Sequence, residues 1–260
     1  MRLPHHSTPA PAIAIPDYAQ PWRGGNGHIG VLLIHGFTGS PWPMKPWAHY
    51  LADAGYRVSV PLLPGHGRTW THLNHTTWQQ WYAQAEEEFL WLRSRCDTVF
   101  VAGLSMGGAL AVRLAETYGE DVAGLMLVNP ALTAPRRRAF TIRAAALVAH
   151  SAPALGDDIR LPGQTDHSYP RTPLHAAVSM LELWKIVTAD LPRVHQPLLI
   201  FHSAHDRVID NSSLILLTER THSCHSRTVQ LPHSGHVATL DYDAQRIHTE
   251  SVRFIKQLCS

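Results

Sequence analysis

The chain has 260 residues, of which 45% are hydrophobic and 16% are charged, and its formal net charge is +2. Such a small fraction of charged residues argues against a disordered chain, and a net charge this close to zero gives no support to nucleic-acid binding. The length suits one large α/β domain with a single core of good size.

The cysteines and the N-terminal segment predict a cytoplasmic protein. The 3 cysteines include no C-x-x-C pair, which favours reduced thiols over a disulfide framework. The N-terminus has no unbroken apolar run, so we expect no signal peptide. The sequence contains no run of about 18 apolar residues, so we expect no membrane span. The 19 histidines lack the spacing of a zinc site, so we predict no metal and no cofactor.

The predicted strands follow an N-terminal arm. Residues 1–28 are rich in proline, glycine and histidine and predict a loose arm, with at most a short edge strand around Ala12–Ile15. Several of the apolar runs that follow are continuous rather than alternating, as in parallel strands buried on both faces. The predicted strands cover residues 29–34, 56–60, 98–102, 122–128, 198–202 and 228–231.

Helical patterns separate most of these strands. Thr77 and Gln80 form the pattern of a capping box at the start of the second helix. Alternation of strands and helices along the chain predicts an α/β fold with a mostly parallel, doubly wound sheet. Apolar residues recur on one helical face within residues 43–54, 77–95, 107–118 and 243–258.

One long interval breaks the alternation. About 70 residues separate the fourth predicted strand from the fifth, far more than a usual crossover. This interval holds the run Arg136-Arg137-Arg138, a helical stretch at 139–149 and a second helix near 174–189. We interpret residues 131–192 as a helical cap inserted into a core made of residues 29–130 and 193–260.

Ser105 lies in the motif G-L-S-M-G, between a predicted strand and a predicted helix. The pattern G-x-S-x-G is typical of a nucleophile elbow, in which a strained turn lifts the serine hydroxyl above the sheet. The same pattern could be a strand–turn–helix joint with an incidental serine. A phosphate-binding loop is disfavoured, because no Gly-Lys-Ser/Thr follows. The motif therefore needs an acid, a base and an oxyanion site to support it.

A serine nucleophile needs a histidine to accept its proton and a carboxylate to orient that histidine. In this fold class the acid and then the base follow the serine along the chain. Asp206 stands in the loop directly beyond a late strand, whereas Asp210 suits the cap of the next helix. His236 follows Gly235, which permits a turn toward the edge of the sheet, whereas His233 still belongs to the strand exit. We predict Asp206 as the acid and His236 as the base.

The oxyanion that forms on attack needs hydrogen-bond donors already in place. We predict the backbone N–H of Met106, directly after the serine, as one donor. The other is the N–H of Phe37, in the loop that follows the first apolar strand. His35-Gly36 before it would by itself be an ordinary glycine turn. The agreement of four elements in order and context makes chance a poor explanation for the set.

These residues resemble the α/β-hydrolase family, and within it the bacterial monoacylglycerol lipase and carboxylesterase branch. The likeness runs from about Ile29 to the C-terminus. It implies the α/β-hydrolase fold with a small helical cap, and it implies the roles just assigned to the triad and the two N–H groups. The matching stretches are H-G-F-T-G-S, P-L-L-P-G-H-G, G-L-S-M-G-G, D-R-V-I and S-G-H-V-A-T-L-D-Y-D.

The resemblance also bears on Asp166 in the cap. In relatives, a cap glutamate before a Tyr-x-x-Thr-Pro segment helps to hold the glycerol part of the substrate. Asp166 stands at the matching place in T-D-H-S-Y-P-R-T-P and is one methylene shorter. The resemblance therefore implies a substrate-binding role for Asp166, and the alternative is a solvated loop carboxylate.

The predicted function is serine carboxyl-ester hydrolysis through an acyl-serine, on monoacylglycerols or short-to-medium-chain esters. The predicted partner is a small-molecule ester, without nucleic acid or stable membrane insertion, and the chain is expected to be a monomer or homodimer. A thioesterase, an acyltransferase or a C–C hydrolase would keep the same triad. A ligand-binding module with this fold is a further alternative, but pure binding needs no intact triad.

Overall fold

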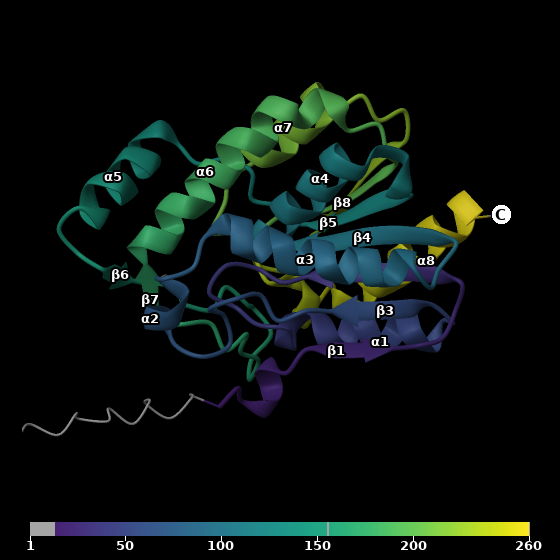
Figure 1. Cartoon of the computed structure of the whole chain (residues 1–260), viewed down its shortest axis with the longest axis horizontal. Coiled ribbons are helices and arrows are strands. Elements are labelled where there is room, and N and C mark those ends of the chain that lie inside the picture. The colour runs from purple at the N-terminus through teal and green to yellow at the C-terminus, as the bar shows by residue number, and fades with distance from the viewer. Residues whose placement is uncertain (1–13, 155, 260) are drawn as a thin grey trace, which may run out of the picture.

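The computed structural model describes residues 14–154 and 156–259. A central sheet with helices on both faces organises the molecule (Figure 1). Its strand order is β1-β3-β2-β4-β5-β8-β9, with β1 antiparallel to β3 and all other neighbours parallel, which confirms the predicted doubly wound sheet. The strands are β1 (Trp22–Gly24), β2 (Ile29–Ile34), β3 (Arg57–Val60), β4 (Thr98–Leu104), β5 (Gly124–Val128), β8 (Leu198–Ser203) and β9 (Ser226–Leu231).

Both faces of the sheet are apolar because helices cover them both. Successive residues of β2 point to opposite faces, so Leu32 packs with α3 and α4 while Val31 packs with α1 and α8. None of the described helices is long and apolar enough to cross a membrane. The helices that flank the sheet are α1 (Lys45–Asp53), α3 (Trp78–Arg93), α4 (Met106–Tyr118), α7 (Ser212–Arg220) and α8 (Ala244–Cys259), and α2 (Trp70–Leu73) is a short helix before α3.

The interval between β5 and β8 forms a largely helical segment. Within it, α6 packs against α3 and α4 of the core and buries Leu183 and Val187 completely. By contrast, α5 has no buried residue and packs against α6 at one end of the molecule (Figure 1). The cap boundaries at residues 131 and 192 stay a prediction. The elements are α5 (Arg136–Ala146), the antiparallel pair β6 (Ser151–Pro153) and β7 (Arg171–Pro173), and α6 (Leu174–Asp190).

The N-terminal segment differs from the prediction. Residues 14–28 are not a loose arm, because β1 joins the sheet beside β3. The strand expected around Ala12–Ile15 is absent at residues 14 and 15, and residues 12 and 13 lie outside the described residues. The buried carboxylate of Glu88 explains the attachment. It accepts two hydrogen bonds from Arg23 of β1, at 2.9 and 2.6 Å, and one from Ser59 of β3 at 2.6 Å. The ion pair thus fixes a strand too short to be recognised by its pattern.

The carboxyl ends of the parallel strands meet at one edge of the sheet. The register pairs Ile34 with Gly103, Leu104 with Val128 and Ser203 with Leu231. Loops that leave β2, β4, β5, β8 and β9 therefore start close together. In open α/β sheets this edge is where ligands bind.

Candidate active site

Ser105 occupies a strained turn between β4 and α4. Its backbone has φ 55° and ψ −118°, a left-handed φ that costs a non-glycine residue about 1–3 kcal/mol and is found at functional sites. The flanking glycines make the turn possible. A Cβ on Gly107 would lie 2.1 Å from the Ile34 carbonyl oxygen, and one on Gly103 would lie 2.3 Å from the Gly107 carbonyl carbon. The motif is therefore required by the close approach of helix and strands.

The structure brings Asp206 and His236 together. Asp206 Oδ2 lies 2.7 Å from His236 Nδ1, and both side chains are almost fully buried, at 3% and 8% exposure. The other oxygen of Asp206 accepts the backbone N–H groups of Val208 and Ile209 at 2.8 and 3.0 Å. These bonds hold the carboxylate in one orientation. An imidazole whose Nδ1–H is held by a carboxylate presents Nε2 as a proton acceptor.

The alternatives considered for the acid and the base lie elsewhere. Asp210 accepts the backbone N–H of Ser212 at 3.0 Å, at the start of α7, and is exposed. His233 is exposed, and its backbone N–H donates to Asp243 at 2.9 Å. Neither residue has a hydrogen bond to Asp206 or His236 within the described part of the chain.

The loop with His236 is fixed by residues that sequence reasoning missed. Asp241 Oδ2 accepts the Gly235 N–H at 2.8 Å, and Asp158 Oδ2 accepts the His236 N–H at 3.0 Å. The side-chain amide of Asn129, which directly follows β5, donates to the His236 carbonyl at 2.8 Å. Asp241 lies in the S-G-H-V-A-T-L-D-Y-D stretch, which offered a signal, but no periodicity or motif marked Asp158 or Asn129.

The two predicted oxyanion donors flank Ser105. Met106 is the first residue of α4, and a Cβ on Gly36 would lie 3.4 Å from Ser105 Cβ, so the loop with Phe37 runs directly beside the serine. Among the described residues, none accepts a hydrogen bond from the N–H of Phe37 or of Met106. Both donors are thus free for a ligand. Ser105 and His236 line the same cavity, and no hydrogen bond joins their side chains in this part of the chain.

A buried histidine holds the loop of Phe37 in place. His35 Nε2 accepts the Leu63 N–H at 3.2 Å, so Nδ1 carries the proton and donates it to the Gly36 carbonyl at 2.9 Å. Burial lowers the pKa of His35 to about 4, which keeps the ring neutral at physiological pH. His35 is therefore a structural support for the loop.

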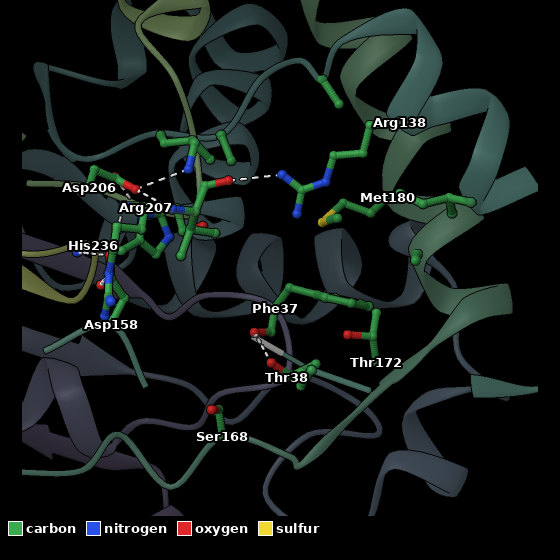
Figure 2. A pocket seen from close by; sticks show the side chains of 18 of the residues that line it. Phe37, Thr38, Arg138, Asp158, Ser168, Thr172, Met180, Asp206, Arg207 and His236 are labelled. Atoms are coloured by element: carbon green, nitrogen blue, oxygen red, sulfur yellow. Dashed lines mark hydrogen bonds and ion pairs between the residues drawn. The ribbon is translucent and has the colours of Figure 1, made fainter. Parts of the chain in front are cut away.

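A cavity of about 600 Å³ opens above the serine, within the usual range for small-molecule sites. Figure 2 shows Asp158, Asp206, Arg207 and His236 gathered on one wall, with Met180 across from them. Polar and apolar side chains are mixed in the lining, and Arg138 of α5 lines the cavity together with Met180 of α6. Besides Ser105, Asp206 and His236, the polar side chains include those of Thr38, Arg138, Asp158, Asp166, Ser168 and Thr172, and the apolar ones include Ala131, Ile142, Leu174, Ala177, Met180 and Trp184.

Asp166 lies in this cavity and has an unusual environment. Its Oδ1 accepts the Ser168 N–H at 2.9 Å. Burial, and next the neighbouring Asp157, raise the pKa of Asp166 to about 6. Asp166 is therefore not a fully solvated carboxylate. Within residues 14–154 and 156–259, no cluster of three His, Cys, Asp or Glu side chains is arranged to hold a metal ion.

Comparison with known proteins places these features in context. The profile of the family described as serine aminopeptidase, S33, matches residues 28–243. The chain is 38% identical over 236 residues to a thermostable monoacylglycerol lipase of Bacillus sp. (strain H-257), covering 91% of this chain and 94% of the relative. It is 22% identical over 243 residues to a carboxylesterase of Bacillus subtilis (strain 168), covering 92% and 97%.

Solved structures give the same picture. A structure from a study of LipS and LipT, two metagenome-derived lipolytic enzymes, superposes with a TM-score of 0.90 at 36% identity, covering 94% of this chain and 100% of that one. A monoacylglycerol lipase of Paleococcus ferrophilus superposes with a TM-score of 0.77 at 17% identity, covering 92% and 98%. At 17% identity, the second comparison shows a shared fold only.

Proposed function

The chain belongs to the serine aminopeptidase S33 family of α/β-hydrolases and is a serine hydrolase of the carboxylesterase type, and we propose that monoacylglycerols are its substrates. The observation that carries the hydrolytic reaction is the 2.7 Å bond between Asp206 and His236 in a cavity shared with the strained Ser105, and the similarity to a monoacylglycerol lipase supports the substrate. A pure binding site would have no use for that combination.

The proposed reaction starts with attack of Ser105 Oγ on the ester carbonyl carbon. His236 Nε2 takes the hydroxyl proton, and Asp206 stabilises the imidazolium. The N–H groups of Phe37 and Met106 donate to the tetrahedral oxyanion. His236 then returns the proton to the leaving alcohol, which leaves an acyl-serine. Water activated by His236 hydrolyses the acyl-serine by the same steps in reverse order.

The mixed lining of the cavity suits a substrate with a polar head and an apolar tail. Apolar side chains of α5 and α6, such as Ile142 and Met180, suit the acyl chain. The carboxyl group of Asp166 and the hydroxyl of Ser168 suit the hydroxyl groups of glycerol. We therefore propose Asp166 as a glycerol-binding residue and residues 131–192 as the cap that admits the ester.

The decisive experiment compares wild type with Ser105→Ala. Both proteins are incubated with p-nitrophenyl esters of increasing chain length, with monoacylglycerols and with an aminoacyl p-nitroanilide. Hydrolysis of the esters and monoacylglycerols by wild type alone is the expected result. Cleavage of the anilide in preference to every ester would favour a peptidase, and equal rates for the two proteins would exclude a serine hydrolase reaction at this site.

The cellular setting and the assembly state complete the proposal. We propose a cytoplasmic protein, supported by the described cysteines Cys96, Cys224 and Cys259, all of which are free thiols. We also propose a monomer or a homodimer. Size-exclusion chromatography with light scattering tests the second statement, and a larger assembly would contradict it.

A further inference from the structure

Asp158 joins the two loops that carry the acid and the base. Its Oδ2 accepts the backbone N–H of His236 at 3.0 Å and that of Arg207 at 2.9 Å. Its Oδ1 accepts Arg207 Nε at 2.7 Å. Arg207 directly follows Asp206, so one carboxylate holds the base and the neighbour of the acid. Figure 2 shows Asp158, Arg207, Asp206 and His236 side by side.

The backbone reinforces this junction. The Asp158 carbonyl accepts the Val237 N–H at 3.2 Å. A Cβ on Gly235 would lie 2.6 Å from the same carbonyl oxygen, so only glycine lets the two segments approach so closely. Asp158 itself belongs to neither loop, since it lies between β6 and β7 in the segment that separates β5 from β8.

Burial of a carboxylate at this place has a cost that the bonds must offset. The Asp158 side chain is 5% exposed, whereas that of Arg207 is 76% exposed. Burial raises the pKa of Asp158, but the hydrogen bonds from Arg207 and from the His236 N–H outweigh it, so the pKa falls below its usual value. Asp158 therefore stays ionised at neutral pH. As an anion it accepts all three bonds, which a neutral side chain of the same size cannot do.

A second carboxylate keeps the segment docked independently of Asp158. Asp241 accepts the N–H groups of Arg160 and Leu161, each at 2.9 Å, and that of Gly235 at 2.8 Å. Loss of the Asp158 carboxylate therefore leaves the segment attached to the loop of His236. The bonds that Asp158 alone supplies run to the His236 N–H and to the Arg207 N–H, on opposite sides of the Asp206–His236 contact.

We propose that Asp158 is a positioning residue that fixes the loops of Asp206 and His236 relative to each other. This inference rests on the proposed function, because it concerns the same triad. It makes the contact between the acid and the base depend on the segment predicted to form the cap. A displacement of reacting groups by about 1 Å can lower a rate by about 10²-fold, so the positioning has a measurable effect.

The test uses Asp158→Ala, with Glu182→Ala as a matched control that removes an exposed carboxylate from α6 of the same segment. For a short p-nitrophenyl ester we expect kcat of Asp158→Ala to fall about 10- to 100-fold, with KM changed less than about twofold. Alanine removes both acceptor oxygens, whereas an asparagine oxygen in place of Oδ2 would still accept both backbone N–H groups. The control should match wild type in both constants.

Proton NMR reads the positioning without turnover. The Nδ1 proton of His236, shared with Asp206, gives a far-downfield signal that is identified by its loss in Asp206→Asn. We expect this signal to broaden or to move upfield in Asp158→Ala and to stay unchanged in Glu182→Ala. If Asp158→Ala keeps both the wild-type signal and the wild-type kcat, the inference is wrong.

Two further arms keep the outcomes separable. If Asp158→Ala does not fold, Asp158→Asn takes its place, because its NH₂ group then faces the donor Arg207 Nε and the junction loses its charge. A kcat a few-fold below wild type supports the inference, and a wild-type kcat with the wild-type downfield signal overturns it. If wild type hydrolyses no ester but Asp158→Ala still loses the downfield signal, the proposed function fails and the positioning role stands.

Discussion

Replacing Asp206 by asparagine changes the protonation of the histidine more than the shape of the site. Oδ1 of Asp206 accepts two backbone N–H groups, and Oδ2 faces His236 Nδ1 at 2.7 Å. The single carbonyl oxygen of asparagine takes the place of Oδ1, so its NH₂ group faces Nδ1. The ring then adopts the tautomer with the proton on Nε2 and cannot accept the proton of Ser105. Such a tautomer lowers kcat about 10⁴-fold, which corresponds to about 5 kcal/mol of barrier.

Asp210→Asn provides the matched control for this prediction. Asp210 is exposed and accepts hydrogen bonds from Ser212 at the start of α7, so its loss should cost at most about 1 kcal/mol of stability and leave kcat near wild type. The assay is steady-state hydrolysis of a p-nitrophenyl ester, with circular dichroism to show that both variants are folded. A large loss at position 210 and not at 206 would refute the assignment of the acid.

The remaining predictions concern the substrate and the stability of the fold. Asp166→Asn should raise KM for monoacylglycerols by more than KM for p-nitrophenyl esters, and equal KM changes would argue against glycerol binding. Met180→Trp should shorten the longest acyl chain that is hydrolysed, because Met180 lines the cavity; an unchanged chain-length profile would place the acyl chain elsewhere. Glu88→Gln should lower the free energy of unfolding in urea by about 1–2 kcal/mol, because the half-exposed Arg23 loses its charged hydrogen-bond partner. A loss close to zero would mean that β1 is held by other contacts. Burial lowers the pKa of His248 to about 4, so the unfolded chain binds a proton that the folded chain does not, and stability falls as the pH drops from about 6.5 to 4. Thermal melts of His248→Phe should show less of this fall, by up to about 3 kcal/mol, and melts parallel to wild type would contradict the assignment.

The central strands could be predicted because burial on both faces leaves a continuous apolar run. The run at 29–34 coincides with β2, and its neighbour at 98–102 lies inside β4, which continues to Leu104 by pairing with β5. The edge strand β1 has no such run. It is held by the ion pair of Arg23 with Glu88, two residues 65 positions apart, so no local pattern could reveal it.

The residues of the candidate site also divide into those that local sequence patterns predict and those that they do not. Ser105 is recognisable because its turn imposes glycines on both sides, and Asp206 and His236 could be chosen because each follows a predicted strand. Asp158 and Asn129 could not be found, since their hydrogen bonds to the loop of His236 join positions 78 and 107 residues apart. Such contacts depend on how separate loops meet, which neither composition nor periodicity records.

The central claim is that Ser105 attacks the ester with the help of His236. The most direct measurement is mass spectrometry of peptides after reaction with an alkyl p-nitrophenyl phosphonate, whose phosphorus is attacked as the ester carbonyl would be. We expect one adduct per chain on Ser105, no adduct in Ser105→Ala, and much slower labelling of His236→Gln. An adduct on another residue, or undiminished labelling of Ser105→Ala, would contradict the account.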